Sequence, residues 1–134
     1  MNISSFDDLL TAARAQPLPQ RLLFVFADIE LPADSTPAER ERFERGEGGS
    51  PVPRMCVDKS PGELNSFADL VTEAHQFQQP WGMVFAAALS GAPGQPPKSE
   101  DADAPLQRMV EAIRQGQWQS YIPFDAQGRA VRML

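Results

Sequence analysis

The chain has 134 residues, of which 42% are apolar and 22% are charged, a composition typical of globular domains and not of disordered or membrane-spanning chains. Its 12 basic and 18 acidic side chains give a net charge of −6, which disfavours the phosphate contacts that nucleic-acid binding needs. One cysteine excludes an intramolecular disulfide, and with one histidine it cannot complete a four-ligand zinc site. We expect a single domain over residues 1–134 that binds no nucleic acid and no metal.

Neither a secretory signal nor a membrane helix is predicted. Residues 1–8 lack the basic and apolar regions of a signal peptide. The longest apolar run, residues 83–89, is much shorter than the about 20 residues that a membrane helix needs. These features predict a cytoplasmic protein that does not bind membranes and whose thiol stays reduced.

The first two predicted elements are a helix and a buried strand. Ser5 and Asp8 form a capping-box pattern at the start of a helix over residues 5–15, whose apolar residues recur at helical spacing. The continuous apolar run over residues 22–27, which ends at Asp28, predicts a strand covered on both faces. We expect this strand to be central in a sheet.

A charged helix and a second strand are predicted next. Thr36, followed by a proline and then Glu39, predicts a short surface helix that inserts only Phe43 into the body. Residues 52–58 alternate loosely, so that one face carries Met55 and Val57. A proline near the start of this strand suits an edge or entry position.

The second half of the chain predicts two more helices and two more strands. The helix signal at Ser60 precedes an apolar face that continues for four turns and ends at Pro80, and residues 83–89 predict another buried strand. Residues 90–104 are rich in proline, glycine and acid, which predicts a flexible loop. This loop serves either as a lid or partner-binding segment or as a tolerated surface insertion.

The last predicted elements are a helix and a hairpin. The helix is capped by Asp103 and ended by Gly116. Two short strands over residues 121–124 and 130–133 flank a turn, and Pro123 indicates an edge strand.

Two segments of the chain are similar to each other. Residues 5–13, SFDDLLTAA, match residues 66–74, SFADLVTEA, at six of nine positions, and in both copies a proline turn leads into a buried strand. Common helix-start patterns are the alternative explanation. If the repeat is real, residues 1–60 and 61–134 are half-repeats, and their two central strands are neighbours near a pseudo-twofold axis.

These patterns together predict a single layered α/β domain, with α+β as the alternative. We expect a mixed sheet of four to five strands flanked by helices, with an internal duplication of a helix–strand–helix–strand unit.

The sequence contains few residues that indicate chemistry. Motifs of the GxGxxG, GxSxG and CxxC types are missing, so we expect no cofactor and assign no catalytic residue. Nothing brings Cys56 and His75 together as a nucleophile and its base. The candidate ligand-binding residues are Asp28, Asp58 and Lys59, because open α/β sheets bind ligands at the carboxyl ends of their strands.

Several segments resemble a small bacterial family that often carries the label ribonucleotide reductase alpha subunit. The matching runs are MNISSFDDLL, RLLFVFA, MCVDKSPGELNSFADLV and LQRMVEAIRQGQWQSYIPFD. The activity in that label requires a pair of redox cysteines and a radical-bearing cysteine. Because this chain has Cys56 alone, the activity is excluded for it and no catalytic residue is carried over. The segment PVPRMCVDKSPGELNSFADL also resembles, in pattern, the N-terminal domain of the secretion-related SseB proteins.

Two functions follow as hypotheses. The first is a non-catalytic domain that binds a protein partner or a second copy of itself, indicated by the acidic charge and by apolar residues outside the predicted core, among them Trp81 and Trp118. The second is a small-molecule or anion-binding or catalytic domain that uses the candidate residues at the strand ends.

Overall fold

The computed structural model describes residues 3–131. Its helices are α1 (Phe6–Arg14), α2 (Pro37–Glu44), α3 (Phe67–His75) and α4 (Asp103–Arg114), with two 3₁₀ turns, η1 (Pro61–Glu63) and η2 (Ser99–Ala102). Its strands are β1 (Gln20–Glu30), β2 (Ser50–Lys59), β3 (Met83–Ser90) and β4 (Ile122–Asp125).

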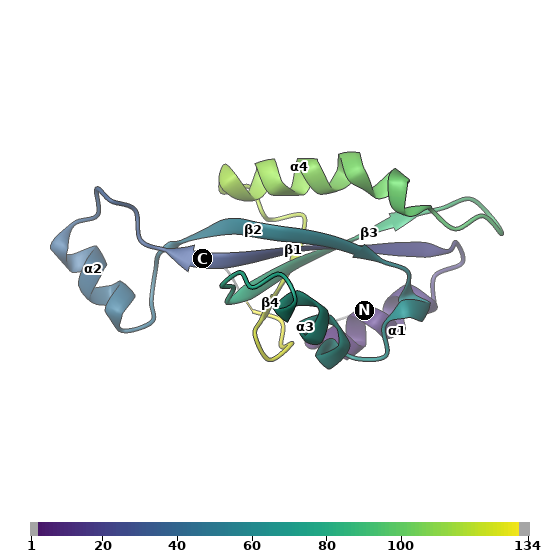
Figure 1. The fold of residues 1–134 in the computed structure, drawn as a ribbon, viewed down its shortest axis with the longest axis horizontal. Coiled ribbons are helices and arrows are strands. Elements are labelled where there is room, and N and C mark those ends of the chain that lie inside the picture. Colours follow the sequence, from purple (N-terminus) through teal and green to yellow (C-terminus); the bar gives the residue numbers. More distant parts are fainter. Residues whose placement is uncertain (1–2, 132–134) are drawn as a thin grey trace.

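The four strands form one sheet in the order β2-β1-β3-β4. Helices flanking a four-stranded sheet in a layered domain confirm the predicted fold class. Every neighbouring pair is antiparallel, however, so the sheet is not mixed as expected. The β1–β2 connection explains part of this, because parallel neighbours need a crossover that packs on the sheet. Helix α2 lies beyond the end of the sheet, so β1 and β2 form a long hairpin (Figure 1).

Helices cover both faces of the sheet. In Figure 1, α4 lies on one face and α1 and α3 lie on the other. Because successive residues of a strand point to opposite faces, β1 supplies both cores. Its Leu22, Phe24 and Phe26 pack toward α1 and α3, and its Leu23 and Val25 pack toward α4. This double burial confirms β1 as a central strand.

Phe6 lies at the centre of the core beneath α1. Its ring centroid is 5.6 Å from that of Phe24, 5.1 Å from that of Phe67 and 5.7 Å from that of Phe124. These partners come from β1, α3 and β4, so one buried side chain joins three elements that are distant in sequence. The tilted and edge-on ring arrangements are those that aromatic pairs prefer.

The long helix predicted after Ser60 is interrupted. Only the turn η1 forms at its start, Leu64 is extended (φ −122°, ψ 129°), and α3 begins after Ser66. Leu64 is only 2% exposed, and the guanidinium of Arg14 donates to the carbonyls of Pro61 and Leu64. Burial of Leu64 and these tertiary hydrogen bonds outweigh the local helix signal.

Residues 90–104 contain more regular structure than the predicted flexible loop. The N–H of Gln95 donates to the carbonyl of Ala92 at 2.9 Å, closing a turn in which Gly94 has φ +70°. A glycine with positive φ after a proline is typical of a type II turn. Pro97 is buried, and η2 leads directly into α4. Asp103 is the first residue of α4 and does not cap it, because the preceding η2 already continues the chain into the helix.

The end of the described chain closes one edge of the sheet. The N–H of Val131 donates to the carbonyl of Pro123, and Ala130 forms an isolated bridge with Phe124. The predicted hairpin is thus present as far as Val131, and its remaining predicted residues, 132–133, lie outside the described residues. The N–H of Ala130 also donates to the carbonyl of Ser4 at 2.9 Å, so the N-terminal segment joins the same edge.

The two halves of the chain are arranged similarly around the centre of the sheet. β1 and β3 are direct neighbours, as predicted, and Val25 lies opposite its aligned counterpart Phe85. Helices α1 and α3 lie on the same face, as a pseudo-twofold axis perpendicular to the sheet requires. The halves differ in their second helices, because α4 packs on the sheet and α2 does not. Duplication as the origin of this arrangement stays a prediction.

Candidate functional site

Two of the three candidate ligand-binding residues lie side by side at the end of β2 and have partners within the chain. Asp58 Oδ2 is 2.5 Å from Arg21 Nε and accepts a hydrogen bond from Ser99 Oγ at 2.8 Å. Lys59 Nζ is 2.8 Å from Glu73 Oε2 on α3. Each ion pair therefore joins β2 to a different neighbouring element, and neither charge is free for a ligand.

The third candidate, Asp28, lies at a distance from the other two. It is opposite Val52 in the β1–β2 ladder, whereas Asp58 is opposite Leu23. Six residues of β2 separate Val52 from Asp58, which corresponds to about 20 Å along a strand. The prediction assumed parallel strands, whose carboxyl ends meet at the same edge of a sheet. Antiparallel neighbours end at opposite edges, so the prediction was wrong for Asp28. The structure thus brings Asp58 and Lys59 together but not Asp28.

Cys56 and His75 do not form a nucleophile–base pair. Cys56 is exposed on β2 and lines a shallow groove beside α4, with Val110 as its apolar neighbour. His75 ends α3, which packs on the opposite face of the sheet. Partial burial of the thiol and the nearby carboxylates of Asp58 and Asp103 raise the pKa of Cys56 above its usual value. A raised pKa makes a thiol a poor nucleophile at neutral pH.

Both tryptophans are partly buried and pack against the cores. The Trp81 ring is 5.0 Å from Phe26 in an edge-on arrangement, and the Trp118 ring is 6.3 Å from Phe85. The tryptophans thus lie at the margins of the cores, outside the set of buried residues as expected, but they do not form a free apolar surface. Within residues 3–131, the exposed large apolar side chain is Phe77, at 49%.

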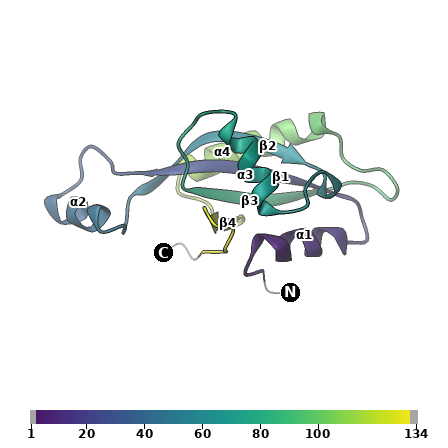
Figure 2. The same ribbon diagram turned by 60° about the horizontal axis from the view of Figure 1, so that its bottom comes forward.

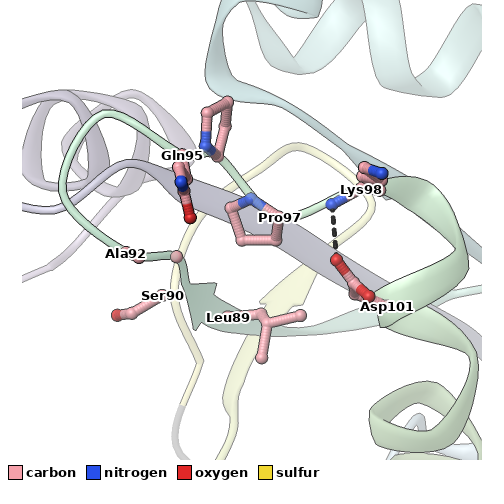
Figure 3. Close-up of a pocket in the computed structure, with 9 residues that line it drawn as sticks. Leu89, Ser90, Ala92, Gln95, Pro97, Lys98 and Asp101 are labelled. Atoms are coloured by element: carbon pink, nitrogen blue, oxygen red, sulfur yellow. Dashed lines mark hydrogen bonds between the residues drawn. The ribbon is translucent and has the colours of Figure 1, made fainter.

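The loop after β3 surrounds an open hollow of about 920 Å³ (Figure 3). Its ionisable lining residues are Lys98 and Asp101, and the Asp101 carboxylate accepts a hydrogen bond from the backbone N–H of Lys98 at 2.8 Å. This hydrogen bond caps η2, so the carboxylate already has a structural role. Among the remaining lining residues, Ser90 and Gln95 have polar side chains, and the others are leucine, glycine, alanine and proline.

The segment between β1 and β2 projects from the domain. We call residues 31–49 the arm; it contains α2 and lies beyond the sheet in both views (Figures 1 and 2). Helix α2 buries none of its residues. Its start is held by a capping box in which Thr36 N–H donates to Glu39 and Glu39 N–H donates to Thr36, at 3.0 and 3.2 Å.

The arm is attached by a small apolar contact at its base. Gly49 has φ +81°, and a Cβ at this position would be 2.7 Å from the side chain of Ile29 and 2.9 Å from the ring of Phe43. Phe43 was expected to insert into the body of the domain. It packs instead against the base of the arm, beside Gly49. Eight of the 19 arm residues are charged, so the arm presents a mainly ionic surface.

No family model, curated protein or solved structure matches the chain, and the resemblances drawn from the sequence therefore stay predictions. Among residues 3–131, no cluster of three or more His, Cys, Asp or Glu side chains is placed to hold a metal ion. No helix in the same range is long and apolar enough to cross a membrane.

Proposed function

We propose that this protein is a non-catalytic cytoplasmic domain that binds a protein partner or a second copy of itself. The observation that carries the proposal is the arm, an ordered and charged helix that stands off the sheet. Helix α2 contributes no side chain to either core.

The energetics of α2 favour a role outside the fold. A helix of eight residues is marginal in water without tertiary packing, yet α2 has a full capping box and a proline at its start. These features stabilise a helix that the cores do not use. A pre-ordered helix loses less conformational entropy when it binds a partner than a disordered segment does.

The intramolecular pairing of the candidate residues is a second support. Asp58 and Lys59 are bonded to Arg21 and Glu73 at short distances, and the Cys56 thiol has a raised pKa. Catalytic groups usually need a free reactive atom in a concave site. These side chains are better explained as stabilising the domain.

The proposal is tested with the full chain as bait and with an arm-shortened variant. Glu30 and Ser50 lie directly opposite each other, so an Asn-Gly turn can replace residues 31–49 and close the hairpin. We expect the full chain to self-associate in light scattering or to retain a specific protein in affinity capture. We expect a partner bound through the arm to be lost in the shortened variant. A strictly monomeric full chain that retains no specific partner would contradict the proposal.

A further inference from the structure

The two edges of the sheet differ in how they are covered. At the β4 edge, Val131 N–H donates to the carbonyl of Pro123 at 3.0 Å, so the outward side of that strand is hydrogen-bonded. At the other edge, β1 is the one strand that pairs with β2 in the described part of the chain. Within residues 3–131, no backbone hydrogen bond joins β2 to any other segment. An uncovered edge strand is a ready template for another strand.

The direction of the hydrogen bonds on β1 can be read from its two ends. The carbonyl of Pro19 accepts from Gly91, and the carbonyl of Ala27 accepts from Gly82, both on the β3 side. In an antiparallel sheet, alternate residues of a strand bond to opposite neighbours. The odd-numbered residues of β1 therefore bond toward β3, and the even-numbered ones bond toward β2.

This alternation shows which groups of β2 face the free edge. Cys56 lies opposite Val25, and Asp58 lies opposite Leu23. Because these β1 residues bond toward β3, the N–H and C=O of Cys56 and Asp58 point away from the sheet.

The prolines of β2 agree with the same alternation. Pro51 and Pro53 lie opposite Ile29 and Ala27, so each proline nitrogen faces outward, where the missing N–H breaks no ladder bond. The first half of the edge thus lacks outward N–H donors and cannot form a complete ladder. The part of the edge with both donors and acceptors begins at the bulge residue Arg54.

We propose that a second copy of this chain pairs with the open part of β2, antiparallel and with Cys56 on the twofold axis. This inference rests on the self-association branch of the proposed function. Centring the pair on Cys56 lets outward-facing backbone groups meet, and it places Arg54 opposite Asp58 of the second copy and Met55 opposite Val57. Opposite charges and apolar side chains across two strands are favourable pairs. In this pairing the Asp58 carboxylate, which already binds Arg21 of its own chain, would be shared with Arg54 of the second copy.

Charge favours this register over those centred on Arg54 or on Asp58. A pair centred on Arg54 or on Asp58 would place like charges directly opposite each other, which is destabilising. Arg54 has no partner residue on β1, since the register shifts there, and its Nε is buried without a hydrogen-bond acceptor. Its ion pair with Glu30 therefore leaves part of the guanidinium unsatisfied within its own chain.

The groove beside Cys56 would lie next to the twofold axis. It is lined by Gln107, Val110, Glu111 and Arg114 of α4, so the α4 helices of both copies would flank the axis on one face of a continuous sheet. Half-buried Met55, Val57 and Val110 would lose further exposure. The partner of this surface is thus an identical chain, which offers the same edge and the same helix.

The pairing predicts a short distance between the two Cys56 residues. Directly opposite residues in a hydrogen-bonded antiparallel pair have Cα atoms about 5.5 Å apart. Cys56 is the single cysteine, so a short bifunctional maleimide can link two chains only through this position. We expect wild type to form a covalent dimer and Cys56→Ser to form none.

The decisive variant is Cys56→Pro, measured by light scattering over a concentration series. The new proline would remove an outward N–H, as Pro51 and Pro53 already do, and leave the β1–β2 ladder intact. We expect wild type and the matched control Cys56→Ser to be dimers and Cys56→Pro to be a folded monomer. If Cys56→Pro does not fold, Arg54→Glu serves instead, and we expect about tenfold weaker dimerisation from two like-charge pairs.

Two results would overturn the inference. One is a wild-type chain that stays monomeric up to millimolar concentration. The other is a dimer that neither links through Cys56 nor dissociates in Cys56→Pro or Arg54→Glu. If the arm still captures a different protein in either case, the proposed function stands and the β2 interface alone is wrong.

Discussion

Among single residues, Gly128 is placed where a side chain has no room. It has φ +81°, and a Cβ there would be 2.9 Å from Cγ of Phe67. We expect Gly128→Ala to cost about 1–2 kcal/mol from the left-handed backbone alone, with a further loss from displacing the Phe67 ring. Urea unfolding measures the total.

Gly48 provides the matched control for this substitution. Its φ is +75°, but no atom lies within 4 Å of a Cβ at that position. Gly48→Ala should therefore lower the free energy of unfolding by the backbone contribution alone, without the steric contribution. Equal decreases in the free energy of unfolding of the two variants would show that the steric clash with Phe67 contributes nothing.

The Cys56 thiol provides a second test at the residue scale. Partial burial and the carboxylates of Asp58 and Asp103 raise its pKa, which lowers the thiolate fraction at neutral pH. We expect iodoacetamide to label Cys56 more slowly than free cysteine at pH 7.5 and the rate to keep rising above pH 9. Asp58→Asn should accelerate labelling, and the same rate in both proteins would rule out this electrostatic effect. Cys56→Ser, which has no thiol, measures the background of the labelling reaction.

At the scale of elements, three helix starts depend on carboxylates. Backbone N–H groups of Ser4, Thr36 and Ser60, followed by the side chains of the same residues, lower the pKa of the carboxylates that cap these starts. The carboxylates belong to Asp8, Glu39 and Glu63.

This lowering predicts a loss of stability in acid. A carboxyl group whose folded pKa is below its unfolded value of about 4 stabilises the fold above that pH. The stabilisation disappears as pH falls through the folded pKa. We expect the Tm, followed by circular dichroism, to decrease below about pH 4. Asp8→Asn should show a smaller decrease in that range, and an unchanged slope would contradict the role of this cap.

The elements also show what local sequence signals could predict. The boundaries of α1 and α2 follow from their capping boxes, since both boxes are formed by neighbouring residues. The same signal at Ser60 produced only η1, because Arg14 and the burial of Leu64 act from outside the segment. The internal repeat contained a better signal for this boundary, which the prediction did not use, since Ser66 aligns with the N-cap Ser5 and is itself an N-cap.

At the scale of the whole molecule, the arm should be separable from the fold. Replacing residues 31–49 by an Asn-Gly turn removes a long connection, which lowers the entropy cost of closing the hairpin. It also removes the packing of Phe43 around Gly49, next to Ile29. Each halving of a loop changes the free energy by about 0.6 kcal/mol, so we expect the stability to stay within about 2 kcal/mol of wild type. Urea unfolding of both proteins tests this, and a much larger loss would show that the arm supports the core.

The arrangement of the candidate residues could be predicted less well than the elements. Composition and apolar runs identify β1 and β3 as central strands, but strand direction depends on whether the connecting helix packs on the sheet. The charged sequence of α2 already indicated a surface helix, and this signal could have suggested a hairpin between β1 and β2. Because this signal was not used, Asp28 was predicted to share a ligand site with Asp58, although the antiparallel ladder separates them.

The contact between the two ends of the described chain has a consequence for how the domain forms. Ser4 and Phe6 bond to Ala130 and Gly128, so segments more than 120 residues apart in sequence lie side by side. Contacts between distant segments slow folding, because a large loop must close before the contact is gained. During synthesis, Phe6 of α1 cannot be fully buried until β4, which carries Phe124, has been made. The nascent chain therefore exposes an unfinished core until residue 130 has been made, and in that interval it depends most on protection from aggregation.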